Sequence, residues 1–330
     1  MRERHLASVL LILTALALLT YLPLFHQPLL EDDYPNIAQA ILYGPVSGWD
    51  RMFHDPLFRP RTTTWLMLYG INRMFGMHAT AYYAAMILLH LLNTWLVYSL
   101  GVWRMLGYQT TAWAAAFFAI SEAHQEAVMW VSASNEPLML LFGLLSFICW
   151  IRFLDQRRAL LYFASLLTFC LALLSKESAV ILALIFVLPI ALAKIRWQSA
   201  AYLAPFCLLA LLSALSIFLN HSRSFRFGDG SFSLEAPFWL VWPENLMRLF
   251  WFWGLLSASA ILIWRPAGYG RILVIGLSWM GIGLLPYSFL TYSARIPSRQ
   301  LYLASVALAL IVGFAMLHLY ERYWSPGARS

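Results

Sequence analysis

The sequence predicts an all-α polytopic membrane protein: a helical bundle of about ten transmembrane helices with a long first loop outside the cytoplasm. Hydrophobic residues make up 62% of the 330 residues and charged residues only 11%, whereas soluble domains carry roughly 25% charged residues. The apolar residues form runs close to the ~20 residues that cross a membrane. The 15 Trp and 16 Tyr residues suit aromatic belts at two membrane faces.

Ten candidate spans follow one another, and we treat residues 1–330 as a single domain. The first span resembles a signal peptide, but no small-residue cleavage site follows it, so we expect it to be kept as a helix. The third is short for a full crossing, so a re-entrant loop is kept as an alternative for this segment. The spans run over 6–24, 80–101, 109–121, 136–153, 159–174, 178–194, 199–219, 245–264, 271–290 and 300–319.

An even number of spans places both termini on one side of the membrane. Basic groups such as "RERH" at the start, "KIR" at 194–196 and "ERYW" near the end share that side, which we assign to the cytoplasm. The basic residues are scattered singly, so nucleic acid is not expected as a partner. We expect a multi-pass protein of a bacterial-type inner membrane, surrounded by membrane lipids. Its outer segments include a first loop at 25–79 and a second large loop at 220–244.

Ionisable and polar residues collect at the outer ends of the spans. A charge at membrane depth costs at least ~2.5–3.5 kcal/mol, so we expect these side chains to face a cavity. Acids from the first half and cations from later turns suit a reaction in which a carboxylate accepts a proton and cations hold a departing anion. The group comprises Glu31, Asp32, Asp33, Arg59, Arg61, His124, Glu126, Asn135, Glu136, Lys176, Glu177, Arg295 and Arg299.

The acidic stretch "LLEDDYPNIAQA" directly follows the first span. Like charges held side by side favour proton uptake by one of them, which suits a general base. A solvated acidic loop or an adventitious cation site is the simpler alternative, but the position beside a transmembrane helix favours a function. By contrast, His90 and Asn93 lie one turn apart within a span, where hydrogen bonds between helices are expected.

Several motifs, in order, resemble the GT-C superfamily of membrane glycosyltransferases. After the acidic pair come "FRPRTTTW", a "HLLN" helix, "HQEAVMWVSASNEPLMLLFGLL", the "SKE" turn in "ALLSKESAV", and "PSRQLYLASVALAL". The chain is most similar to protein O-mannosyltransferase-like and tetratricopeptide-repeat transmembrane mannosyltransferases. No repeat domain follows the last span in this sequence, so a glycan, lipid or cell-wall polymer acceptor is expected at least as much as a protein acceptor.

The resemblance implies a GT-C bundle whose active site lies outside the cytoplasm, beneath the first loop. It implies transfer of a sugar, such as mannose, from a polyprenyl-phosphate donor to an acceptor, with inversion. Asp32 would be the general base, and Asp33 would orient the acceptor or a cation. The lipid phosphate would be bound by residues drawn from Lys176, Arg295 and Arg299, with Arg59 and Arg61 as alternatives.

Alternative roles remain open for these residues. Arg295 and Arg299 also suit interfacial lipid anchors, and Lys176 with Glu177 suits a structural charge pair. Other residues expected to line the cavity are His124, Glu126, Asn135, Glu136, Glu177 and Tyr302. No cofactor is certain; a divalent metal held by Asp32, Asp33, His124 and Glu126 is left open, because their spacing establishes no site.

Two other classes of function compete with the enzyme. A transporter or flippase of lipid-linked sugars should show inverted repeats and charged residues near mid-span, whereas the charged residues here gather at one face. A non-catalytic membrane scaffold would not need the acidic pair.

Overall fold

A computed structural model of the chain describes residues 2–54, 61–192, 197–219, 233, 236–289 and 298–324. These residues form helices and connecting turns, with no strand among them. Seven helical segments within the described ranges are long and apolar enough to cross a membrane: Leu6–His26, Ala79–Val102, Val131–Gln156, Ser199–Ile217, Phe238–Trp264, Tyr269–Tyr287 and Ser298–Tyr323. The predicted all-α membrane protein is therefore confirmed, and the number of crossings beyond these seven stays a prediction.

The long helices form the bundle, and shorter helices connect them. The bundle helices are α1 (Arg2–Tyr21), α5 (Ala79–Ser99), α6 (Tyr108–Ile120), α8 (Asn135–Gln156), α9 (Ala159–Leu173), α12 (Ala204–Leu219), α14 (Phe238–Trp264), α15 (Tyr269–Leu284) and α16 (Tyr302–Tyr323). The shorter α-helices are α2 (Asp33–Tyr43), α3 (Trp49–His54), α4 (Thr62–Phe75), α7 (Gln125–Met129), α10 (Leu182–Ile185) and α11 (Leu188–Leu192). Because α14 begins at Phe238, the last residues of the predicted 220–244 loop are helical.

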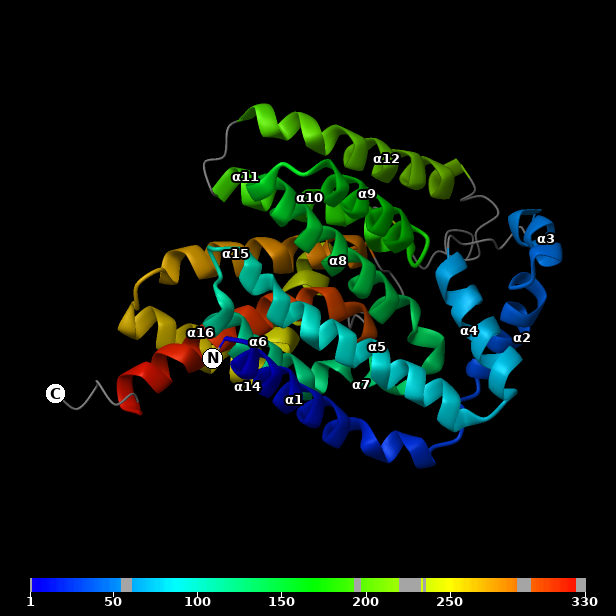
Figure 1. The fold of residues 1–330 in the computed structure, drawn as a ribbon, viewed down its shortest axis with the longest axis horizontal. Coiled ribbons are helices and arrows are strands. Elements are labelled where there is room, and N and C mark those ends of the chain that lie inside the picture. The colour runs from blue at the N-terminus through cyan, green and yellow to red at the C-terminus, as the bar shows by residue number, and fades with distance from the viewer. Residues whose placement is uncertain are drawn as a thin grey trace.

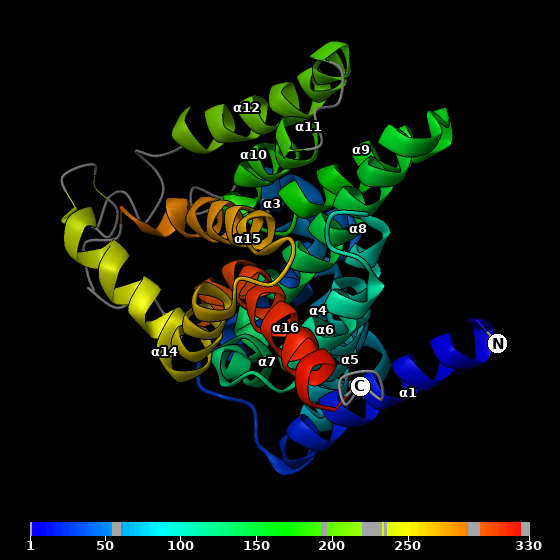
Figure 2. The same cartoon turned by 90° about the vertical axis from the view of Figure 1, so that its left-hand side faces the viewer.

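Helix α16 lies at the centre of the bundle. Every residue from Tyr302 to Ala315 is buried, and the helix packs against α6, α14 and α15. Figure 2 shows α16 near the middle, with α14 and α1 on opposite flanks. This position explains a sequence that is apolar on all sides, since a helix buried all round has no polar face.

Two polar side chains of α5 join neighbouring helices. His90 Nδ1 lies 2.7 Å from the Tyr302 hydroxyl of α16, and Asn93 Nδ2 donates to the Pro137 carbonyl of α8 at 2.9 Å. The predicted hydrogen bonds between helices are therefore confirmed. They fix α5 against both neighbours without leaving these donors unpaired in an apolar interior.

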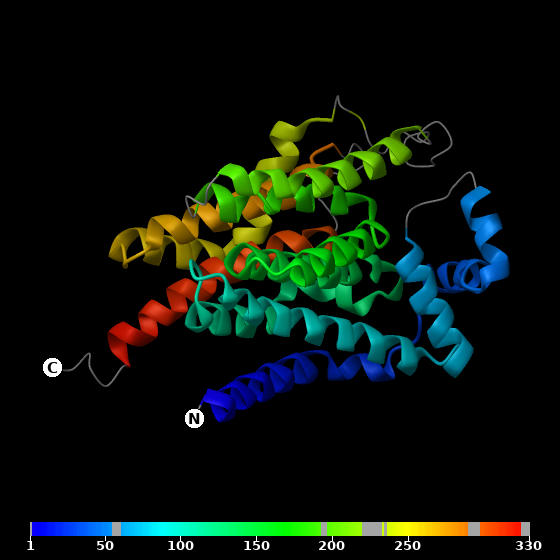
Figure 3. The same ribbon diagram turned by 45° about the horizontal axis from the view of Figure 1, so that its top comes forward.

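The first loop folds into the helices α2, α3 and α4 rather than an irregular segment. These helices lie at one end of the molecule, and both chain termini lie at the opposite end (Figures 1 and 3). Helix α4 ends at Phe75. The next residue, Gly76, has a φ of +61°, a conformation that glycine adopts without steric cost, and its N–H donates to the Asn72 carbonyl. The bundle therefore carries a compact helical layer at the end remote from the termini.

Candidate functional site

The Asp33 carboxylate is buried and holds two segments together. Its Oδ2 accepts a hydrogen bond from the Leu30 N–H at 2.9 Å. Its Oδ1 accepts from the N–H of Ser132 at 2.8 Å and from the Ser132 hydroxyl at 2.7 Å. The side chain is fully buried, so these donors replace the water that an ionised carboxylate otherwise requires. Asp33 therefore ties the start of α2 to the turn before α8.

Asp32 has a different environment. Its side chain is exposed, while its backbone carbonyl accepts a hydrogen bond from the Asn36 amide at 2.8 Å and lies 2.9 Å from the Ser132 hydroxyl. The backbone is thus held by two contacts while the carboxylate faces outward. Such a carboxylate is available to a substrate, which is the first requirement for a general base.

A second cluster surrounds Glu136 in the first turn of α8. Its carboxylate forms an ion pair with Lys176 and lies 3.5 Å from the Tyr287 hydroxyl. The Lys176 ammonium also lies 5.1 Å from the centre of the Tyr287 ring, and the Ser178 and Tyr287 hydroxyls are 3.1 Å apart. Both charged side chains are almost fully buried, at 6% and 1% exposed. This pair therefore joins three helical segments in the interior.

Glu177 pairs with a different cation. The Arg61 guanidinium at the start of α4 donates to both Glu177 carboxylate oxygens at 3.2–3.4 Å. Beside this pair, the Thr63 hydroxyl donates to Ser175 Oγ at 2.7 Å. Lys176 and Glu177 thus each form an ion pair with a residue of another segment, Lys176 with Glu136 and Glu177 with Arg61. These contacts attach the first-loop helices to the "SKE" turn.

A third charge pair joins Glu126 of α7 to Arg299. Glu126 Oε2 accepts hydrogen bonds from the Ser298 hydroxyl at 3.0 Å and from the Arg299 N–H at 3.1 Å, and Oε1 pairs with the guanidinium. The guanidinium also lies over the Trp130 ring, 4.4 Å from its centre, in a cation–π contact. Both charged side chains are partly exposed.

His124 and Tyr302 lie in the interior rather than at a surface. His124 Nε2 lies 2.7 Å from the Ser305 hydroxyl, and its ring packs edge-on against Tyr302. Burial, with a smaller contribution from the neighbouring His90, lowers the pKa of His124 well below its usual range. His124 is therefore a neutral packing residue at physiological pH.

Asp32, Asp33, His124 and Glu126 are not brought together around one point. Asp33 and Glu126 bind separate donors, and His124 is enclosed by aromatic rings. Within the described part of the chain, no group of three His, Cys, Asp or Glu side chains is arranged to hold a metal ion. Arg59 and Arg295 lie outside the described residues.

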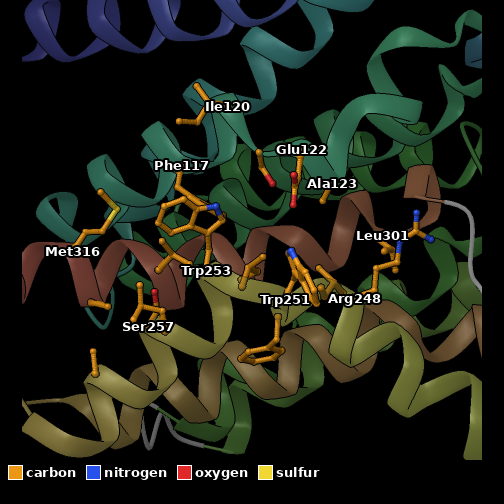
Figure 4. A pocket seen from close by; sticks show the side chains of 18 of the residues that line it. Phe117, Ile120, Glu122, Ala123, Arg248, Trp251, Trp253, Ser257, Leu301 and Met316 are labelled. Carbon is orange, nitrogen blue, oxygen red and sulfur yellow. The ribbon is translucent and has the colours of Figure 1, made fainter.

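A cavity of about 810 Å³ lies between α6, α14 and α16 (Figure 4). Most of its wall is apolar, including Phe117, Trp253 and Met316. Its lining extends from Leu301, in the 3₁₀ turn before α16, to Leu319 on α16, which is about 27 Å at 1.5 Å per residue, close to the roughly 30 Å thickness of a hydrocarbon core. The cavity therefore has the length and polarity that suit a lipid chain.

Most of the polar residues of this cavity gather toward one end of its lining: Ser121, Glu122, Gln125, Arg248 and Ser298. Ser257 lies apart from them, farther along α14 (Figure 4). None of the six other residues predicted to line a cavity lines this one: His124, Glu126, Asn135, Glu136, Glu177 and Tyr302. Glu126 is nevertheless its neighbour, since Ser298 both lines the cavity and donates to Glu126.

Sequence reasoning missed Arg248 and Ser132. Arg248 was a lone cation inside a predicted span, and an ionisable residue at such a position is a signal of function. Ser132 was visible only as part of the "WVS" motif, because its role depends on Asp33, 99 residues away. Compared with known proteins, the chain matches no protein-family model and no curated protein.

Proposed function

We propose that the chain is a membrane glycosyltransferase that moves a sugar from a polyprenyl-phosphate donor to an acceptor outside the cytoplasm. The proposal rests on a series of contacts that connects Asp32 to Arg299. The exposed Asp32 is joined through Ser132 to the segment that bears Trp130, and Arg299 stacks on Trp130 beside the polar end of the apolar cavity. A carboxylate open to solvent and a lipid-sized cavity thus border the same segment. The resemblance to the GT-C superfamily points to the same reaction.

In the proposed reaction, the acceptor hydroxyl attacks the anomeric carbon of the donor sugar. Asp32 takes the hydroxyl proton, and the bond between the anomeric carbon and the phosphate oxygen breaks. The polyprenyl phosphate leaves with the bonding electrons, and the sugar configuration inverts. Because charge builds on the phosphate as the bond breaks, a nearby cation lowers the barrier.

Arg299 is the best-supported cation for the phosphate. Its side chain is partly exposed, the preceding residue Ser298 lines the polar end of the cavity, and a guanidinium binds phosphate through two parallel donors. Arg248 lines the same end of the cavity. Lys176 fits less well, because it is enclosed against Glu136. The apolar cavity would hold the polyprenyl chain.

We also propose ten membrane crossings with the active site outside the cytoplasm. In addition to the seven long segments, Ala159–Leu173 and Glu177–Leu192 are apolar helical segments, and α6 is a third short helix. Ten crossings agree with both termini lying at one end and the first-loop helices at the other (Figure 1).

The proposal is tested with purified protein in lipid vesicles supplied with polyprenyl-phosphate sugars and cell-envelope acceptors. Asp32→Asn is expected to slow release of polyprenyl phosphate by about 10²–10⁴-fold, the usual contribution of a general base. The melting midpoint should not change, because the Asp32 carboxylate is exposed. The matched control is Glu31→Gln, which removes the neighbouring exposed acid and should leave turnover near the wild-type rate.

Unchanged turnover in Asp32→Asn would show that Asp32 is not the general base. Movement of intact lipid-linked sugar across the vesicle membrane, with no transfer to any acceptor, would establish a transporter instead.

A further inference from the structure

Several donors converge on the Glu126 carboxylate in its pair with Arg299. Three donors from two consecutive residues reach the Glu126 carboxylate: the Ser298 hydroxyl, the Arg299 N–H and the Arg299 guanidinium. The carboxylate therefore occupies a small anion site made by residues 298–299. A phosphate group offers the same kind of acceptor oxygens with more charge.

This anion site can be reached by a ligand. The Arg299 and Glu126 side chains are 20% and 30% exposed, whereas Lys176 and Glu136 are 6% and 1% exposed. Arg299 is also supported from behind by the Trp130 ring at 4.4 Å. The guanidinium would therefore keep its position if Glu126 moved away.

The site adjoins the polar end of the cavity. Ser298, one of the three donors, lines the cavity, as does Gln125, the neighbour of Glu126. A lipid whose chain filled the cavity would place its headgroup at this end, because the remaining wall is largely apolar. The ligand suited to both parts is a lipid with a phosphate head.

We infer that Glu126 is an exchangeable internal ligand of Arg299, which the phosphate of a lipid displaces on binding. This inference rests on the proposed function for the identity of the lipid as polyprenyl phosphate or its glycosylated form. Glu126 then acts through Arg299 and not on the reacting atoms. It competes with the phosphate for the guanidinium, which speeds release of the product lipid.

The competition between carboxylate and phosphate can be measured directly by binding, without turnover. Long-chain polyprenyl phosphate would be titrated into the protein held in nanodiscs of neutral lipid. Glu126→Gln should bind it about threefold to tenfold more tightly, the range expected for loss of a partly exposed charge pair. Binding of the uncharged polyprenol should not change. Asp50→Asn, which removes an acid that is 87% exposed, is the control for net charge and should behave as the wild type.

A double-mutant cycle tests whether the effect passes through Arg299. Arg299→Gln should weaken polyprenyl phosphate binding about tenfold or more, and adding Glu126→Gln should then give no gain. In turnover, Glu126→Gln should show stronger inhibition by polyprenyl phosphate. If Glu126→Gln does not fold, Glu126→Asp serves the same test, because its shorter carboxylate cannot reach the backbone N–H and the guanidinium together.

Three results would overturn the inference. One is unchanged or weaker polyprenyl phosphate binding by folded Glu126→Gln, and another is a gain that persists in the Arg299→Gln background. The third is an equal gain with inorganic phosphate alone, which would identify a free phosphate rather than a lipid head as the ligand. Failure of the Asp32→Asn test would not alter these affinities, so the two proposals fail separately.

Discussion

Asp32 and Asp33 are adjacent in the chain, but their carboxylates have opposite environments. Asp33 enters the first turn of α2, where its side chain points inward to Ser132 and to the Leu30 N–H. Asp32 precedes the helix, and its side chain remains exposed. Asp33 therefore orders the backbone around it, while the Asp32 carboxylate stays open to solvent.

Replacing Asp33 should affect stability before it affects chemistry. In Asp33→Asn, an amide N–H₂ takes the place of one carboxylate oxygen. The new amide donor then faces a donor of Leu30 or Ser132 in place of the acceptor that was there. Hydrogen bonds to charged groups contribute about 1.5–3 kcal/mol each, so we expect a loss of roughly 2 kcal/mol. Thermal unfolding in detergent checks this, with Asp32→Asn as the matched neighbour, whose midpoint should stay at the wild-type value. Equal midpoints for both variants would show that the Asp33 hydrogen bonds do not matter.

At the scale of helices, α16 packs against α6 at very short range. A Cβ atom added at Gly313 would lie 2.4 Å from the Ala114 backbone nitrogen and 2.7 Å from its Cα. Small residues let membrane helices approach closely enough for direct backbone packing. Gly313 therefore sets the distance between α16 and α6, and these helices form two walls of the cavity.

Gly313→Ala should push α16 away from α6. The obstructing atoms belong to a backbone and cannot rotate aside, so we expect a loss of about 1–3 kcal/mol together with a changed cavity. The control is Gly70→Ala in α4, where nothing lies within 4 Å of the added Cβ, and a gain of about 0.5–1 kcal/mol is expected. Melting midpoints of the two variants should move in opposite directions. A Gly313→Ala protein as stable as the wild type would contradict the close packing.

At the scale of the whole molecule, the two ends of the bundle differ. Both termini lie at one end, and α2, α3 and α4 lie at the other (Figures 1 and 3). The charge pairs that join the first loop to the bundle, such as Arg61 with Glu177, connect the end that bears α4 to the "SKE" turn. The "SKE" turn therefore lies at the same end of the molecule as the first-loop helices.

Sidedness can be measured by cysteine labelling of intact cells. After replacement of the native cysteines by serine, Asp50→Cys should react with a membrane-impermeant reagent added from outside. Arg158→Cys should react only after the membrane is opened. Both positions are exposed, so a difference in labelling reflects the side and not burial. The reverse pattern would place the acidic pair in the cytoplasm.

Local composition was enough to predict the membrane class, the helical structure and the buried roles of His90 and Asn93, because hydropathy and periodicity depend on near neighbours in the chain. The pairing of charges was decided only by the tertiary structure. Glu136 binds Lys176, 40 residues away, and Asp33 binds Ser132, 99 residues away. The cavity likewise arises where α6, α14 and α16 meet. Which helices become neighbours depends on side-chain packing across the whole bundle, and no local pattern in the sequence specifies it.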